Sequence, residues 1–322
     1  MAKLPPGARR ALRYSITAIV VIVVGVLFAR ALSANWEEFV AQDLEFDWLW
    51  VIAVLLFAVA VPLSGLLWGQ IVNRLSHGHR VTPREAMAVQ CASWLLKYVP
   101  GQVGAVVNKV AWGSARGLSR TLIVITFIYE NVFLQIASIV PSAVIILLAL
   151  GSDVFAENPV TLLLPLLMLV PLVAVLVPDV FHRVLSLATR RVLKQDLPQE
   201  YFLPTRTTLG YLVEFLGPRI LNGAGFVVIA VSIAQPPPSQ WLLFGAAYVL
   251  AGAIGILAVF VPSGLGVREA VIFAVLVAAG VPAATAAVLS ILSRLLSTIA
   301  DGAVALLYVA LRVPGPKDTP SS

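Results

Sequence analysis

Charged side chains inside long apolar segments are the residues of this sequence that could do chemistry. An ionised group in a bilayer costs several kcal/mol unless it is paired or hydrated, so such residues are candidates for binding or transport. Four acids lie in these segments, at Glu130, Glu214, Glu269 and Asp301. Six cations lie there as well, at Arg30, Lys97, Lys109, Arg219, Arg268 and Arg294. The excess of cations favours a site for an anion.

Two breaks that contain Pro and Gly position the strongest candidates. The first reads KYVPGQVG over 97–104, and the second reads PSGLG over 262–266. Proline removes a backbone donor and glycine permits a sharp turn, so we expect interrupted helices at both places. The residues predicted to form the breaks are Pro100, Gly101, Gly104, Pro262, Gly264 and Gly266.

The predicted headgroup-binding residues are Lys97, Arg268 and Arg294. Lys97 lies at the first break, and Arg268 lies where a helix would begin after the second. A helix start presents free N–H groups and the positive end of the helix dipole, which suits phosphate. We therefore predict that these three cations hold an anionic headgroup. The predicted charge partners in the empty site are Glu130, Glu214, Glu269 and Asp301.

Simpler roles stay open for several of these side chains. Lys97 and Lys109 could both extend their ammonium groups to the cytoplasmic interface. Glu269 could only cap the start of its helix. Arg294 and Asp301 are seven residues apart on one helical face and could belong to an ion pair that holds helices together.

Composition excludes most classes of soluble protein. Of the 322 residues, 60% are hydrophobic and 12% are charged, whereas soluble domains carry about 25% charged residues. The single cysteine, Cys91, permits no disulfide within the chain, and the three histidines have no metal-ligand spacing. No nucleotide-binding motif is present. We expect no catalytic residue, no metal, no cofactor and no nucleic-acid partner.

Apolar runs predict an all-α polytopic membrane protein with about six full spans. A span needs about 20 apolar residues. One integral membrane domain is expected over 1–322, with the first span at 13–33. The other five expected spans are 48–73, 121–150, 161–178, 209–233 and 283–311.

The distribution of Lys and Arg predicts the topology, because these residues collect in cytoplasmic segments. The loops 34–47, 151–158 and 234–239 contain neither residue. Sixteen of the 22 Lys and Arg residues lie in the N-terminal segment, the loops 74–84, 113–120 and 179–208, and the C-terminal tail. Both termini and the loop 179–208 are therefore expected in the cytoplasm.

This topology requires 85–112 to enter and leave the membrane on the cytoplasmic side, as a re-entrant hairpin. The stretch 240–281 would be a second hairpin that opens outside; if its arms span instead, the total rises to eight spans. With two hairpins, the halves 48–150 and 209–311 have the same pattern in opposite orientations. Inverted repeats with broken helices are typical of transporters.

Both breaks carry a recognisable pattern. The first, followed by Gly113 and Gly117, is similar to the K-x-x-P-G-x-x-G signature of the lysylphosphatidylglycerol synthase transmembrane-region family. The second matches the family run P-x-G-x-G-x-R-E, with Arg294 downstream. The resemblance covers about 10–312, with the motifs in the right order.

The resemblance implies a lipid-handling membrane domain. In the multiple peptide resistance factor, this domain looks like the flippase half, and stand-alone members are linked to polyprenol-linked sugar lipids. The synthase proteins carry a soluble aminoacyltransferase domain after the membrane part, which is missing here, so we expect no aminoacyl transfer.

The expected function is therefore transport rather than catalysis. We expect a lipid translocase for an anionic phospholipid or a polyprenyl-phosphate-linked lipid, in the cytoplasmic membrane of a prokaryote. One alternative is a membrane-embedded transferase acting on lipid-linked sugars. The other is a non-catalytic partner of a lipid-synthesis enzyme.

Overall fold

The computed structural model describes residues 46–76, 78, 80–96, 103–151, 183, 186, 187, 190, 199–258 and 264–312. The predicted first span, the span 161–178 and most of the loop 179–208 lie outside these residues. The described part is helical and contains no strand. Its α-helices are α3 (Trp48–Leu75), α4 (Pro83–Leu95), α5 (Val103–Ala115), α6 (Arg120–Leu150), α10 (Thr205–Glu214), α11 (Leu216–Ile233), α12 (Trp241–Leu257), α13 (Val267–Ala278) and α14 (Ala283–Leu311).

Five helical stretches are long and apolar enough to cross a membrane, by length and composition. They are α3, α6, α14, the continuous stretch α10–α11, and α12 with the short 3₁₀ turn Pro238–Gln240 before it. The all-α polytopic prediction is thus confirmed, and the four predicted spans that fall on described residues are long apolar helices. The fifth stretch is the first arm of the segment 240–281.

The helix boundaries follow from local sequence. The Thr82 hydroxyl accepts the Glu85 N–H, and the Glu85 carboxylate accepts the Thr82 N–H, so a capping box starts α4. The Ser119 hydroxyl caps α6 by accepting the Leu122 N–H at 3.1 Å. Gly266, with a φ of +80°, precedes α13.

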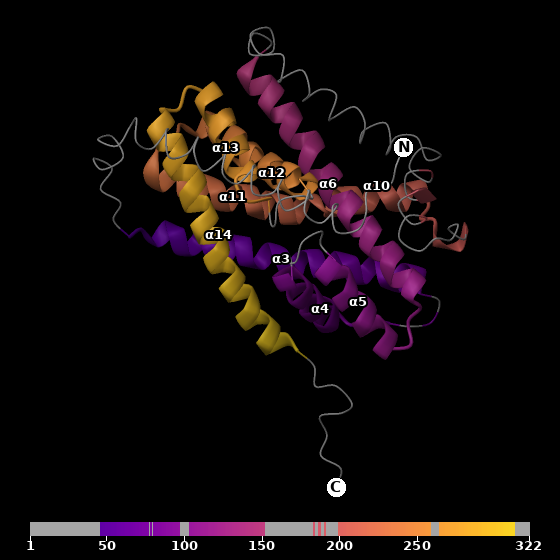
Figure 1. The fold of residues 1–322 in the computed structure, drawn as a ribbon. Coiled ribbons are helices and arrows are strands. Elements are labelled where there is room, and N and C mark those ends of the chain that lie inside the picture. The colour runs from indigo at the N-terminus through magenta and orange to yellow at the C-terminus, as the bar shows by residue number, and fades with distance from the viewer. Residues whose placement is uncertain are drawn as a thin grey trace, which may run out of the picture.

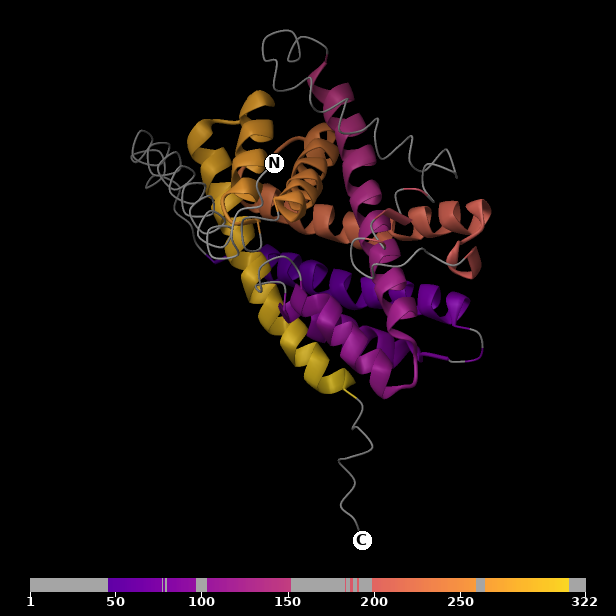
Figure 2. The same ribbon diagram turned by 45° about the vertical axis from the view of Figure 1, so that its right-hand side comes forward.

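Each half of the chain places a pair of short helices between longer ones. The helices α4 and α5 pack against each other near one end of the molecule, and α12 and α13 do so at the other (Figure 1). Between these pairs, α3 packs along α11. The long helices α6 and α14 cross the molecule, and α6 packs on α12 as α14 packs on α4 (Figure 2). Each long helix thus contacts the short-helix pair of the opposite half.

Small residues let α3 approach α4 closely. A Cβ on Gly65 would lie 2.6 Å from the Gln90 Cβ, and one on Gly69 would lie 2.6 Å from the Ala86 Cβ. The two glycines are four residues apart, which is the small-residue spacing of closely packed membrane helices. Lipid tails are as apolar as leucine, so this close fit stabilises helix association through van der Waals contact.

The start of α4 and the end of α5 lie close together. Glu85, at the start of α4, forms an ion pair with Arg116, just after α5. Arg84 donates to the carbonyls of Ala310 at 3.2 Å and Leu311 at 3.1 Å, so the end of α14 lies at the same place. Each arm has 13 residues, about 20 Å of helix, which is shorter than the ~30 Å hydrocarbon core.

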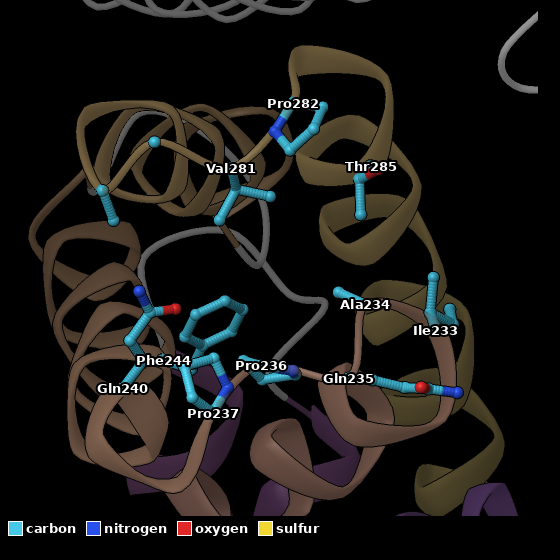
Figure 3. Close-up of a pocket in the computed structure, with 12 residues that line it drawn as sticks. Ile233, Ala234, Gln235, Pro236, Pro237, Gln240, Phe244, Val281, Pro282 and Thr285 are labelled. Atoms are coloured by element: carbon cyan, nitrogen blue, oxygen red, sulfur yellow. The ribbon is translucent and has the colours of Figure 1, made fainter.

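The α12–α13 pair also begins and ends at one place. Gln240, just before α12, and Gly280, just after α13, line the same cavity of about 370 Å³ (Figure 3). The turn of Pro236 and Pro237 forms part of its wall. The 12 residues of α13 reach about 18 Å, too short to cross a bilayer.

Candidate functional site

A buried ion pair joins the helices of the first half. Lys109 on α5 pairs with Glu130 on α6, and the two residues are only 1% and 2% exposed. The Gln90 amide on α4 donates to the other carboxylate oxygen at 2.7 Å. The Lys109 ammonium also lies 4.2 Å from the centre of the Trp68 ring on α3. The Lys109–Glu130 pair thus connects the four helices α3, α4, α5 and α6. The Trp68 ring takes the place of water beside the ammonium group.

This pair corrects two sequence interpretations. Lys109 does not extend to the interface, because its side chain is enclosed in protein. Among the described cations, Glu130 pairs with Lys109 rather than with Arg268 or Arg294. One feature of the sequence could have indicated this ion pair: Lys109 and Glu130 lie in the interior of consecutive helices that are joined by a short basic loop.

A second ion pair occupies the matching place in the other half. The Arg294 Nε on α14 lies 3.7 Å from the Glu269 Oε1 on α13. The other Glu269 oxygen accepts the Gly266 N–H at 2.6 Å, so Glu269 also caps its helix. In both halves the pair joins the second short helix to the long helix after it, with acid and base exchanged.

Arg268 is the cation nearest the second break that has no acid partner. Among the described residues, no carboxylate lies within ion-pair distance of its guanidinium, which instead lies 5.3 Å from the centre of the Tyr248 ring. That ring stacks between Phe57 and Phe226, with centroid distances of 5.1 Å and 5.2 Å. A packed aromatic wall therefore holds Arg268 from one side.

Arg219 on α11 lies within electrostatic range of Glu130 in the first half and of Arg268 in the second. It is half-buried, and its Nε is enclosed with no hydrogen-bond acceptor among the described residues. Its charge is repelled by Arg268 and attracted by Glu130. The sequence alone assigns no role to Arg219, because only the fold brings α11 against α3 of the first half.

Glu85, at the start of α4 and outside the long spans, has a lowered pKa. Partial burial alone would raise the pKa of Glu85. The hydrogen bond from the Thr82 N–H and the Arg116 guanidinium outweigh that effect, and they hold the pKa below its ordinary value.

The motifs, the helices and the charges now permit a comparison with known proteins. A family model for the lysylphosphatidylglycerol synthase TM region matches residues 15–305. The chain belongs to this family. A search of curated proteins finds no match. Membership in the lysylphosphatidylglycerol synthase TM region family, together with the apolar helices, identifies a multi-pass membrane protein with a membrane-embedded, lipid-related role.

Of the residues predicted to form the two breaks, Gly264 and Gly266 lie in the turn before α13 and have positive φ angles. The φ of Gly264 is +63°, in the left-handed region. Gly104 lies in the first turn of α5. Lys97, Pro100, Gly101 and Pro262 lie outside the described residues.

The two remaining predicted charge partners differ in their surroundings. Asp301 on α14 is buried and accepts the Trp94 indole N–H of α4 at 2.8 Å, so it joins the two halves. Glu214 ends α10 and is exposed. No ion pair among the described residues joins Glu214 to Arg219, as their five-residue spacing predicts.

Proposed function

We propose that this protein is a lipid translocase, which moves an anionic phospholipid or a polyprenyl-phosphate-linked lipid across the cytoplasmic membrane of a prokaryote. The observation that carries the proposal is Arg268 at the start of α13, where a permanent charge has no carboxylate partner among the described residues. A cation kept at membrane depth without a protein anion suits an anionic substrate.

The neighbouring groups complete a headgroup site. The start of α13 contributes backbone N–H groups and the positive end of the helix dipole. Glu269 occupies the Gly266 N–H at 2.6 Å, while its contact with Arg294 at 3.7 Å is longer than a hydrogen bond. Arg294 would be the second cation of the site, beside a Glu269 carboxylate that stays on its cap. Lys97 at the first break would be the third cation.

The packing of the halves supports a route across the membrane. We infer that α4–α5 and α12–α13 are re-entrant hairpins that open on opposite sides, and that 48–150 and 209–311 form an inverted repeat. The α3–α11 contact lies at the centre, and each long helix rests on the hairpin of the other half. Rocking one half against the other would expose the headgroup site to each side in turn.

Reconstitution tests this function. Purified protein in phosphatidylcholine vesicles with a fluorescent phosphatidylglycerol should speed the loss of signal when an impermeant quencher is added outside. Arg268→Gln and Arg294→Gln should each slow this exchange about tenfold or more, since each removes a charge-assisted contact worth about 1.5–3 kcal/mol. Arg120→Gln is the matched control, because Arg120 is an exposed arginine at the start of α6.

Two outcomes would overturn the proposal. Unchanged exchange in folded Arg268→Gln and Arg294→Gln protein would remove these residues from the site. A change in the mass of the lipid during the assay would identify a transferase instead of a translocase.

A further inference from the structure

Arg219 has a buried donor that no residue in the described part of the chain uses. Its Nε is enclosed, and no described residue accepts its hydrogen. An unsatisfied buried donor is destabilising, and more so on a charged group, so its presence calls for a missing acceptor. A guanidinium keeps its charge at any physiological pH, so the acceptor has to tolerate a full positive charge.

Arg219 and Arg268 are within electrostatic range of each other, and Tyr248, whose ring centre lies 5.3 Å from the Arg268 guanidinium, is also within electrostatic range of Arg219. They come from different helices, α11 and α13, so their proximity is a product of the fold. Two like charges held together in a partly buried place destabilise the empty protein. A ligand that neutralises both would remove that cost.

The surrounding charges do not balance these two arginines. In the described part of the chain, ion pairs and electrostatic range connect six charged groups: Lys109, Glu130, Arg219, Arg268, Glu269 and Arg294. Glu130 is already paired with Lys109, and Glu269 with Arg294. An excess of two positive charges remains. Neither break sequence, 97–102 or 259–263, contains an acid, and the first contains the cation Lys97.

We propose that Arg219 and Arg268 together bind a lipid phosphate that carries two negative charges, such as a terminal phosphomonoester or a diphosphate. A phosphodiester lipid brings one charge and would leave one arginine uncompensated. A phosphomonoester carries about −1.5 to −2 at pH 7 and offers three acceptor oxygens, enough for two guanidinium forks. This inference rests on the proposed lipid-binding function and narrows its substrate class.

A binding measurement separates the charge class from transport. The probes are phosphatidic acid, which has a terminal phosphomonoester, and phosphatidylglycerol with the same acyl chains, which has a diester. Both are titrated into purified full-length protein in zwitterionic micelles, and affinity is followed by native mass spectrometry. The wild-type protein should prefer phosphatidic acid by about tenfold or more, which corresponds to about 1.4 kcal/mol.

Three variants make the test specific to Arg219. Arg219→Gln should abolish most of the preference and leave phosphatidylglycerol affinity within about threefold, because Arg268 and Arg294 remain. Arg219→Lys keeps the positive charge but loses the planar, forked set of N–H donors of the guanidinium. It should therefore retain part of the preference for phosphatidic acid. Arg206→Gln, an exposed arginine on α10, is the matched control and should behave as wild type.

The possible failures are distinct. If both lipids bind equally to the wild-type protein, or if Arg219→Gln keeps the full preference, the charge-class inference is wrong while the headgroup site stands. If neither lipid binds, the proposed function itself fails. If Arg219→Gln does not fold, Arg268→Gln decides in its place, because it removes the other charge of the pair, and an unchanged preference for phosphatidic acid in that variant would contradict the charge-class inference.

Discussion

The stem of Arg268 fills the space beside Gly255. A Cβ on Gly255 would lie 2.5 Å from the Arg268 Cγ, closer than real Cβ contacts come. The absent side chain of a residue on α12 thus lets the cation of α13 turn toward the Tyr248 ring. A glycine with no chemistry of its own helps to position the charge.

Gly255→Ala should therefore weaken anion binding. The added methyl forces Arg268 out of its rotamer, so we expect lipid exchange to fall severalfold while the protein still folds, at a stability cost of about 1–3 kcal/mol. Exchange in vesicles and thermal unfolding in detergent are the measurements. Gly252→Ala on the same helix has open space around its Cβ and serves as control. Normal exchange by Gly255→Ala would contradict the placement of Arg268.

Gly264→Ala should be more severe than Gly255→Ala. Gly264 has a φ of +63°, and its Cβ would lie 2.7 Å from the Gly255 Cα, which is backbone and cannot turn away. Backbone strain adds to the clash, so we expect a loss of more than about 2 kcal/mol. Thermal unfolding in detergent checks the order of the two variants. Equal stability of both would show that α12 and the turn before α13 do not lie this close.

The break at 262–266 could be predicted from the sequence because it combines a proline with two closely spaced glycines, whereas the single prolines Pro62 and Pro141 lie inside the unbroken helices α3 and α6. The positive φ of Gly264 and Gly266 confirms this at the second break. The count of Lys and Arg predicts that 85–112 returns to the side it left, which stays a prediction; the Glu85–Arg116 ion pair shows that the start of α4 and the end of α5 lie together. Such signals are local or depend on the bilayer, so one sequence can carry them.

The sequence alone does not predict which buried charged residues pair with each other. Lys109 and Glu130 are 21 residues apart on different helices, and their pairing depends on how α5 packs on α6. The seven-residue spacing of Arg294 and Asp301 suggested a shared role, yet Arg294 faces Glu269 on α13 and Asp301 faces Trp94 on α4. Helical periodicity predicts which residues share one face of a helix, but it does not predict which other helix packs against that face.

Lys109→Met should strongly destabilise the protein. It leaves Glu130 as an uncompensated buried charge, and removal of one partner of a buried pair costs about 3–5 kcal/mol. The double variant Lys109→Met with Glu130→Gln removes the stranded charge and should recover at least half of this loss. Unfolding in detergent measures both. A double variant as unstable as the sum of its parts would mean that the pair contributes no coupling.

Trp94→Phe should loosen the contact between the halves. It removes the indole donor that Asp301 accepts at 2.8 Å and keeps most of the aromatic packing. Side-chain hydrogen bonds between membrane helices contribute about 0.6 kcal/mol on average, with a maximum of about 1.7. We expect a small loss of stability and a larger change in exchange rate, if α14 moves relative to α4 during transport. Trp48→Phe, at a residue 76% exposed, is the control, and equal exchange in both variants would exclude this contact from the cycle.

Acid should weaken the contact between the start of α4 and the end of α5 through Glu85. Because its folded-state pKa is lowered, the Glu85 carboxylate contributes stability above its unfolded pKa of about 4.5, and that contribution is lost as the pH falls through the folded pKa. Glu85→Gln keeps a hydrogen-bond acceptor but cannot titrate, so its melting temperature should fall less than that of wild type between about pH 5 and pH 3. Glu200→Gln, an exposed acid at the turn Gln199–Tyr201, is the control. Parallel pH profiles for wild type and Glu85→Gln would mean that the Arg116 and Thr82 contacts do not stabilise the carboxylate.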